Sequence, residues 1–233
     1  MDVLKAENIN IAYGARVILA NVSLTVRQGE TLIIAGLSGC GKTSLCYALT
    51  GLLPGVIPAR LTGHISLAVK IGMVFQDADS QIICTKVEDE LAFGLENLGQ
   101  PAPQIRQKVD VTLQRFGLTD LRLQNPALLS GGQKRLLTLA SIMILDPQIL
   151  ILDEPMCGLD EAGRLMVEQA IAELRDQGHT LIIVEHDLRT VTWADRWLIL
   201  ADGRIDRLDT PQNLLDKPQR LTDLGLWLET GTL

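Results

Sequence analysis

The sequence predicts an α/β protein with a mainly parallel core sheet, and three observations carry this prediction. Aliphatic runs that are typical of buried strands alternate with segments of helical spacing. Apolar residues make up 47% of the chain and aromatic residues only 3%, so Leu, Ile, Val and Ala must form the core, as in parallel sheets. A glycine-rich segment, residues 36–43, stands between a predicted strand and a predicted helix.

The N-terminal part of the chain is predicted to be rich in β structure. Residues 3–35 contain alternating and continuous apolar runs, and residues 31–35 form an unbroken apolar strand that enters the glycine-rich segment. A helix is expected over residues 41–51. Prolines and glycines then predict a long loop over residues 54–63, followed by a short hairpin or two strands over residues 65–76.

The pattern changes to helical spacing after this point. Residues 77–133 are predicted to form a mostly helical insert. The expected elements after it are a buried helix (134–145), a strand (149–153), a helix (161–177), a strand (180–184), a helix after Asp187, and a hairpin turning at Asp202-Gly203. We therefore expect one domain, 1–233, in which 1–76 and 134–233 form a core with an N-terminal antiparallel β subdomain and 77–133 form a helical subdomain.

Composition disfavours several classes of protein. A net charge of −7 disfavours nucleic-acid binding, which needs a basic surface. The start of the chain lacks the pattern of a secretion signal, and the longest strongly apolar stretch, residues 136–145, is too short to span a bilayer. The four cysteines form no CxxC pair, so a zinc site or disulfide framework is not expected. We expect a cytoplasmic protein whose membrane role, if any, comes through a partner.

The glycine-rich segment Gly36-Leu37-Ser38-Gly39-Cys40-Gly41-Lys42-Thr43 matches the P-loop pattern G-x-x-x-x-G-K-[ST]. In this pattern backbone N–H groups and a helix N-terminus surround phosphate. Lys42 would reach the β- and γ-phosphates, and the Thr43 hydroxyl would face Mg²⁺. The alternative interpretation is a glycine-rich turn. Cys40 is predicted to be a reactive thiol, because the helix N-terminus and Lys42 favour its thiolate. The alternative interpretation is a small, inert loop residue.

Residues 149–154 read as an apolar strand that ends in two acids, Asp153 and Glu154. The alternative interpretation is a core strand with a solvated acidic tip. Beside a P-loop, Asp153 would hold Mg²⁺ through water, and Glu154 would orient and deprotonate the attacking water as general base.

The segment Leu129-Ser130-Gly131-Gly132-Gln133 has a local structural interpretation. Ser130 with Gln133 three residues later is a capping box, so a well-capped helix would explain it. The same helix start exposes backbone donors to an anion, and beside the other motifs that anion would be a γ-phosphate.

Together and in this order, the three motifs resemble those of the ATP-binding cassette (ABC) ATPases, over essentially the whole chain. The resemblance implies a P-loop NTPase fold and Mg²⁺-dependent ATP hydrolysis. It implies that Tyr13 stacks on adenine, that Gln76 touches Mg²⁺ and the attacking water, and that His186 contacts the γ-phosphate. The implied catalytic residues are Glu154, His186, Gln76 and Lys42; the nucleotide-binding residues are Tyr13, Gly36, Leu37, Ser38, Gly39, Cys40, Gly41, Lys42, Thr43 and Ser44; the Mg²⁺ residues are Thr43, Gln76 and Asp153.

In this family two cassettes dimerise head to tail. The resemblance implies that Ser130, Gly131, Gly132, Gln133 and Asp160 act in trans, on the nucleotide of a second ABC ATPase subunit in a homo- or heterodimer. It also implies that transmembrane subunits dock in a groove beside Gln76, which we expect to be lined by residues 76–98. The apolar members there are Ile82, Ile83, Val87, Leu91 and Phe93.

Residues 77–81, 85–97 and 52–58 are similar to those of the energy-coupling-factor and cobalt-type importers. This implies an ATPase subunit on the cytoplasmic side of the membrane that energises uptake of a vitamin or transition-metal ion. Residues 63–76 are shorter than expected of the family, and Cys157 stands where Ala or Ser is usual. The alternative is a non-transport ABC ATPase acting on nucleic acid or ribosomes, which the acidic charge and the absence of heptads disfavour. A P-loop kinase or GTPase would leave residues 129–133 unexplained.

Overall fold

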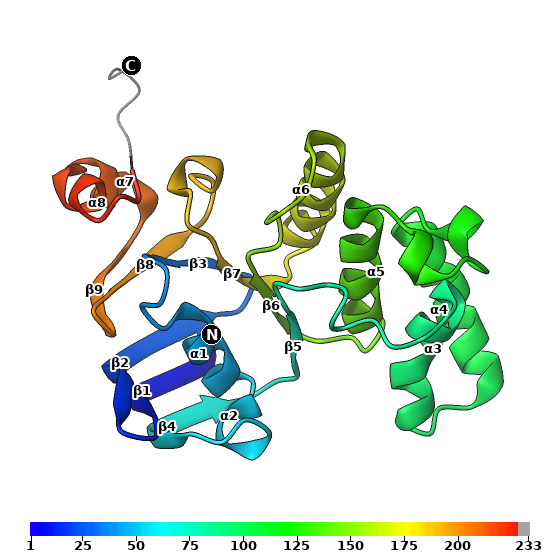
Figure 1. The fold of residues 1–233 in the computed structure, drawn as a ribbon, viewed down its shortest axis with the longest axis horizontal. Coiled ribbons are helices and arrows are strands. Elements are labelled where there is room, and N and C mark those ends of the chain that lie inside the picture. Colours follow the sequence, from blue (N-terminus) through cyan, green and yellow to red (C-terminus); the bar gives the residue numbers. More distant parts are fainter. Residues whose placement is uncertain (228–233) are drawn as a thin grey trace.

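Two β-sheets organise residues 1–227, the part of the chain that this computed structural model describes (Figure 1). The six-stranded sheet has the order β5-β6-β7-β3-β8-β9, and its first five strands are parallel. Its strands are β3 (Thr31–Gly36), β5 (Ile71–Val74), β6 (Ile149–Asp153), β7 (Thr180–Val184), β8 (Arg196–Ala201) and β9 (Arg204–Asp209). Strand β9 pairs antiparallel with β8, so the expectation of a mainly parallel core sheet is confirmed.

The core lies on both faces of this sheet, and strand β3 shows how. Successive side chains of a strand point to opposite faces. Leu32 and Ile34 pack into a cluster with helix α1 (Lys42–Leu49) and the N-terminal sheet. Ile33 and Ala35 pack into a second cluster with α5 (Gly131–Met143) and α6 (Glu161–Asp176). All six residues of β3 are buried, so the strand that leads into the P-loop is held rigidly from both sides.

The N-terminal sheet is antiparallel, with the order β2-β1-β4. Its strands are β1 (Asp2–Tyr13), β2 (Arg16–Arg27) and β4 (Arg60–Leu67). One sequence prediction needs correction here, because the long loop predicted over 54–63 is interrupted by the short helix α2 (Leu52–Gly55) and by the start of β4. Of the two alternatives predicted over 65–76, the structure has two strands and no hairpin: β4 pairs with β1, and β5 pairs with β6 in the other sheet.

Gly63 explains why the sequence reads as a loop. It lies within β4 at φ +104°, and a Cβ there would stand 2.5 Å from the carbonyl oxygen of Asn8. The pairing of β1 with β4 is irregular between Glu7 and Asn10. A glycine in a strand commonly marks such a bulge.

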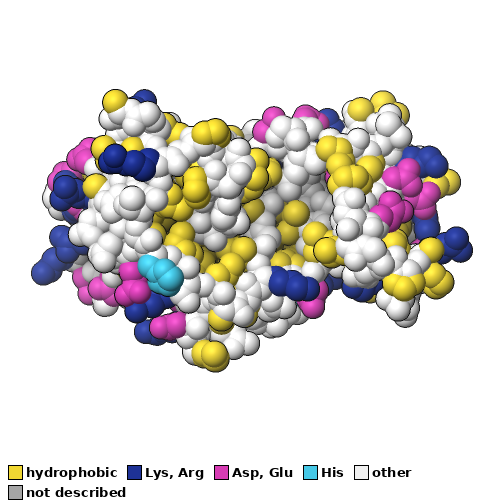
Figure 2. All heavy atoms as spheres, turned by 90° about the horizontal axis from the view of Figure 1, so that it is seen from below, with side chains coloured by type: hydrophobic (Ala, Val, Ile, Leu, Met, Phe, Trp, Pro, Cys, Tyr) yellow, Lys and Arg dark blue, Asp and Glu magenta, His cyan; other side chains and the backbone are white. Residues whose placement is uncertain are grey.

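Helices α3 (Val87–Asn97) and α4 (Ala102–Arg115) form the helical part of the fold, which lies beyond α5 on the side away from the sheets (Figure 1). They are followed by two short 3₁₀ turns, Thr119–Leu121 and Pro126–Leu128. Seen from below, the surface is hollowed between the sheets and this helical part, and hydrophobic side chains gather there (Figure 2). In the described residues, no helix is long and apolar enough to cross a membrane.

Other helix boundaries differ modestly from the predictions. Helix α5 begins three residues earlier than residue 134, because Ser130 caps it. The helix expected after Asp187 is only a 3₁₀ turn, Leu188–Thr190. The chain described ends with α7 (Pro211–Leu215) and α8 (Gln219–Asp223). The division into core and helical subdomains stays a prediction.

Candidate functional site

The P-loop joins the end of β3 to the start of α1. Gly39 and Gly41 have left-handed backbone, with φ of +78° and +106°. A Cβ on Gly41 would stand 2.5 Å from a methyl group of Leu19, so the close approach and the positive φ both require glycine. The loop curls around the buried ammonium of Lys42, whose Nζ donates to the carbonyl oxygens of Gly36 (2.7 Å) and Leu37 (3.2 Å). The loop and its lysine therefore have the arrangement that surrounds a phosphate.

Asp153 ends strand β6 two strands away from β3 in the same sheet. Its side chain is buried, and burial raises the pKa of its carboxyl group, while a hydrogen bond from Thr43 acts in the opposite direction. A carboxylate and a hydroxyl in contact are hard oxygen donors of the kind that Mg²⁺ prefers. The described residues contain no cluster of three or more His, Cys, Asp or Glu that could hold a metal ion.

Glu154 and Gln76 meet beside Asp153. The Nε2 of Gln76 donates to Oε2 of Glu154 at 2.7 Å, and lies 3.8 Å from Sγ of Cys157. Glu154 has φ +46°, an uncommon conformation for a residue other than glycine, and its amide donates to the carbonyl of Val184 (3.1 Å). Strained residues of this kind cluster at active sites. The structure thus brings together two residues that lie 78 positions apart in the sequence.

His186 follows β7, the neighbour of β6, so it lies at the same edge of the sheet. Its imidazole is 66% exposed, and Nδ1 stands 3.1 Å from Oε1 of Glu185. The buried Glu185 carboxylate also accepts from the backbone amides of His186 (2.8 Å) and Asp187 (3.1 Å). Glu185 therefore holds the backbone amides of His186 and Asp187 and contacts one edge of the imidazole, which stays exposed to solvent.

Tyr13 lies at the end of β1, with its hydroxyl 3.4 Å from Oγ of Ser44 on α1. This contact places the tyrosine beside the residue that follows the P-loop motif. Stacking of Tyr13 on adenine stays a prediction.

The start of α5 has the capping box that the sequence predicts. Ser130 Oγ accepts from the Gln133 amide (3.3 Å), and Gln133 Oε1 accepts from the Ser130 amide (3.0 Å). Ser130 and Gly131 are exposed. Asp160 caps α6 by accepting from the amide of Gly163 at 2.8 Å. The roles of these residues in trans stay predictions.

The sequence motifs did not predict two residues of α5, Arg135 at the site and Lys134 beside it. Arg135 is buried, and its guanidinium donates to the backbone carbonyls of Phe75 (2.7 Å) and Gln76 (2.6 Å). Lys134 pairs with Asp79 at 2.6 Å. The one available signal was a charge within the apolar run of a helix predicted to be buried, which indicates a residue with specific partners.

The expected reactivity of Cys40 is not supported. Burial raises the pKa of its thiol, which outweighs the opposing charge of Lys42. Burial thus favours the thiol over the thiolate, which supports the alternative of an inert loop residue.

An apolar groove of about 520 Å³ lies beside the segment that leads to Gln76. It is lined by residues of three elements and the loops near them: Thr50, Leu52, Lys70, Ile71, Gly72, Met73, Phe75, Gln81, Leu98, Ile142, Leu145 and Pro147. Gln81 and Leu98 are its members from residues 76–98. The expectation that this segment lines the docking groove of a membrane subunit stays a prediction. Val87 and Leu91 pack inside the helical part, whereas Ile83 and Phe93 are exposed but do not line the groove.

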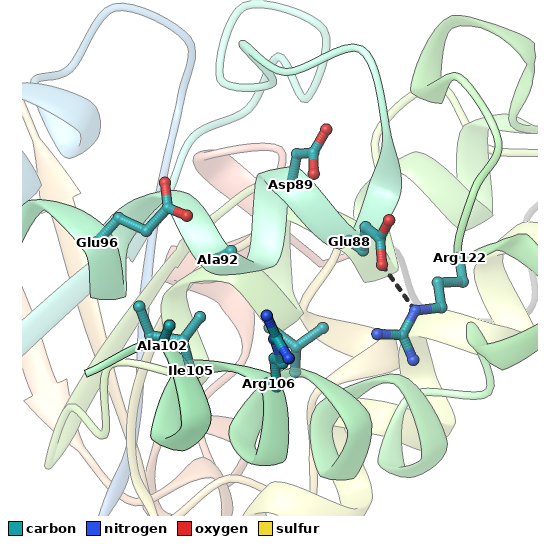
Figure 3. A pocket seen from close by; sticks show the side chains of 9 residues that line it. Glu88, Asp89, Ala92, Glu96, Ala102, Ile105, Arg106 and Arg122 are labelled. Carbon is teal, nitrogen blue, oxygen red and sulfur yellow. Dashed lines mark hydrogen bonds and ion pairs between the residues drawn. The ribbon is translucent and has the colours of Figure 1, made fainter. Parts of the chain in front are cut away.

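A smaller pocket of about 220 Å³ lies between α3 and α4 (Figure 3). Glu88 pairs with Arg122 across it at 2.7 Å, and Arg122 also pairs with Asp110 at 2.6 Å. No residue of the nucleotide motifs lines it. Through these partly exposed ion pairs, Arg122, which follows the turn after α4, is joined to Glu88 of α3 and Asp110 of α4. Pairs of this kind stabilise the packing of the two helices only modestly.

Comparison with known proteins agrees with this geometry. The model of the ABC transporter family matches residues 19–157. The chain is 37% identical to an energy-coupling factor transporter ATP-binding protein, EcfA1, of Lacticaseibacillus paracasei, over 97% of this chain and 85% of that protein. It is similar to the structure of cbiO1 from Clostridium perfringens, part of the transporter complex cbiONQ (TM-score 0.81, 28% identity, 97% and 96% of the two chains).

A second similar structure is an ABC transporter described as metal-chelate type in an inward-facing conformation. It has a TM-score of 0.84 and 26% identity, and the match covers 97% of this chain and 89% of that one. The family match spans more than half of the chain, and the motifs lie where a nucleotide site requires them. The chain therefore belongs to the ABC transporter family and is an ABC ATPase.

Proposed function

We propose that this chain is the Mg²⁺-dependent ATPase subunit of a membrane importer of the energy-coupling-factor type. The observation that carries the catalytic part is the 2.7 Å contact between Gln76 and Glu154 beside the buried Asp153. Asp153 ends β6, Glu154 follows it, and the side chain of Gln76 reaches Glu154. All three therefore lie at the edge of the sheet where β3 enters the P-loop. A carboxylate, an amide and a phosphate-binding loop at one edge are the groups that phosphoryl transfer to water needs.

The reaction follows from these positions. Lys42 and the amides of residues 38–43 bind the phosphates, and Thr43 and Asp153 would hold Mg²⁺, which neutralises charge on the β- and γ-phosphates. Gln76 orients a water in line with the γ-phosphorus, and Glu154 accepts its proton as the new P–O bond forms. The bond to the bridging oxygen breaks, and ADP leaves with the electron pair. His186 contacts the γ-phosphate from the exposed end of β7.

A second cassette completes the site in this proposal. The exposed amides at the start of α5, beside Ser130 and Gly131, would bind the γ-phosphate held by the P-loop of the partner subunit. Gly132, Gln133 and Asp160 would contribute to the same interface. What supports this is the start of α5 itself, where Ser130 and Gly131 are exposed.

The membrane subunit would dock in the apolar groove lined by Leu98 and Phe75, among others. A groove that exposes apolar side chains is typical of a partner site. The chain would then lie peripherally on the cytoplasmic face of the membrane. The cargo class is a vitamin or transition-metal ion, supported by the energy-coupling-factor relatives and the metal-chelate type neighbour. These relatives do not favour the alternative of an ATPase acting on nucleic acid or ribosomes.

The test is co-purification and transport. Expressed with the membrane subunits encoded beside its gene, the chain should co-purify with them and support uptake of the cargo into vesicles loaded with Mg·ATP. Vesicles loaded with ATP and EDTA are the control and should show no uptake. A chain that hydrolyses ATP but binds no membrane subunit, and whose hydrolysis is stimulated by RNA or ribosomes, would support the non-transport alternative.

A further inference from the structure

Arg135 ties helix α5 to the segment that carries Gln76. Only 4% of Arg135 is exposed, which is unusual for arginine. Its Nη1 donates to the carbonyl of Phe75 (2.7 Å) and its Nη2 to the carbonyl of Gln76 (2.6 Å). Burial lowers the pKa of this guanidinium, against the opposing effects of Cys157, Asp77 and Asp153. Within residues 1–227, its buried Nε–H has no hydrogen-bond acceptor. A buried donor without an acceptor lowers the stability of the fold, so packing alone does not explain an arginine at this position.

The two carbonyl groups are those of the peptide groups on either side of the Gln76 Cα atom. Holding both peptide groups restricts rotation about both backbone bonds of Gln76. The side chain of Gln76 in turn donates to Oε2 of Glu154 at 2.7 Å. A continuous set of short contacts therefore runs from α5 through Arg135 and Gln76 to Glu154.

Glu154 is one end of this set of contacts, and the start of α5 is the other. Arg135 lies four residues after Gly131, one helical turn from the exposed Ser130 cap. A rigid helix transmits a displacement of its first turn to Arg135 directly. Lys134 adds a second link to the same segment, but its partner Asp79 is 70% exposed, so this ion pair contributes little.

We propose that Arg135 is a positioning residue that couples the start of α5 to the general base. Phosphate bound at Ser130 and Gly131 sets the position of α5, and Arg135 then sets the backbone of Gln76 and thereby its contact with Glu154. This inference rests on the proposed function, because the role of Glu154 and the phosphate at α5 belong to it. Its consequence is that phosphate bound at the start of α5 changes the position of the general base in the same subunit.

The chemistry of the contact distinguishes arginine from lysine. The planar fork of a guanidinium presents two donors in fixed relation and can hold two carbonyls at once. A lysine ammonium is one point charge on a flexible stem, so it can hold one carbonyl well but not both. Arg135→Lys should therefore restore part of the function that Arg135→Met removes.

The experiment compares four variants of the full-length chain, purified with its co-purifying membrane subunits: Arg135→Met, Arg135→Lys, Lys134→Met and Glu154→Gln. The readouts are kcat and KM for Mg·ATP, the Kd of a fluorescent ATP analogue, and Tm. Misplacing a catalytic group by about 1 Å can cost on the order of 10²-fold in rate. We expect Arg135→Met to lower kcat about tenfold to hundredfold with KM and Kd nearly unchanged. Arg135→Lys should fall between it and the parent, and Lys134→Met should resemble the parent.

A double variant separates positioning from general damage. If Arg135 acts through Glu154, Arg135→Met should add little to the loss caused by Glu154→Gln. A parental kcat in folded Arg135→Met, or fully multiplicative losses in the double variant, would overturn the inference. If Arg135→Met does not fold, Arg135→Lys decides: parental kcat overturns the inference, and reduced kcat at parental Kd supports it. Parental kcat in Glu154→Gln would instead overturn the proposed function.

Discussion

Gly132 of α5 and Gly163 of α6 face each other so closely that neither has room for a side chain. A Cβ on Gly132 would stand 2.5 Å from the Cα of Gly163, and one on Gly163 would stand 3.2 Å from the Cα and amide nitrogen of Gly132. The two helix starts therefore touch backbone to backbone. Because Ser130 caps one helix and Asp160 the other, this contact fixes the two caps relative to each other.

Replacing Gly132 by alanine should force these helices apart. The new methyl group meets backbone atoms that cannot rotate away, and overpacking of this kind costs about 1–3 kcal/mol. We expect the free energy of unfolding in urea to fall by that amount, less the gain in helix propensity of up to about 1 kcal/mol. Gly131→Ala is the control, because its Cβ meets only the end of the Leu159 side chain at 3.2 Å. Equal urea midpoints for the two variants would contradict the close contact.

Glu154→Gln should keep ATP binding and lose hydrolysis. The amide is nearly isosteric with the carboxylate but cannot accept the proton of the attacking water, and a positioned base contributes about 10²–10⁴-fold. The measurement is single-turnover hydrolysis, with gel filtration to detect an ATP-bound dimer. Glu168→Gln, which removes only a surface pair with Arg164, is the control. Hydrolysis at the parental rate in Glu154→Gln would remove Glu154 from the mechanism.

A charge in the groove should prevent docking of the membrane subunit. Leu98 is 64% exposed and lines the groove, so Leu98→Glu places a carboxylate on the apolar docking surface. Co-purification should be lost while nucleotide binding is retained. Leu123→Glu is the matched control, since Leu123 is 69% exposed but lies outside the groove. If Leu98→Glu co-purifies as well as Leu123→Glu does, the docking surface lies elsewhere. Ile83→Glu, also outside the groove, should behave as the control does.

Cys84 should react slowly with maleimide, and Glu90 should contribute to this. Burial and the nearby Glu90 carboxylate raise the pKa of the Cys84 thiol to about 11. Relative to an ordinary thiol, that lowers the reactive thiolate fraction at neutral pH by about a hundredfold. Because a negative neighbour disfavours the thiolate, Glu90→Gln should lower the pKa and shift the rise of labelling rate toward lower pH. Peptide mass spectrometry over a pH series measures it; superimposable pH curves would show that Glu90 has no effect.

The strands of the parallel sheet were predictable because burial alone determines them. Strands β6 and β7 have the predicted bounds, 149–153 and 180–184, since each is a fully buried aliphatic run between polar residues. Strand β4 was missed at its start, because most of its residues are exposed and Gly63 interrupts the pattern. Periodicity carries little information in a strand such as β4, where Leu61 and Ile65 are only partly buried and the other residues are exposed.

The candidate site divides in the same way. The P-loop, the acids after β6 and the cap at Ser130 are local patterns, so their positions followed from the sequence. The contacts of Arg135 with the carbonyls of Phe75 and Gln76 join segments about 60 residues apart. The groove is likewise built from α2, β5, the end of α5 and Leu98. Such contacts depend on how elements pack, which no local pattern contains.

The order of strands in the six-stranded sheet also bears on how the protein is made. Strand β3 leaves the ribosome early, but both of its neighbours, β7 and β8, come from the last quarter of the chain. The β1–β2 hairpin can form as soon as it emerges, whereas β3, which is buried along its whole length in the fold, has no partner until residue 184 has been synthesised. Unpaired strands of this kind are prone to aggregate and attract chaperones. A nascent chain halted before β7 would thus carry the entire P-loop and still be unable to assemble the sheet that holds it.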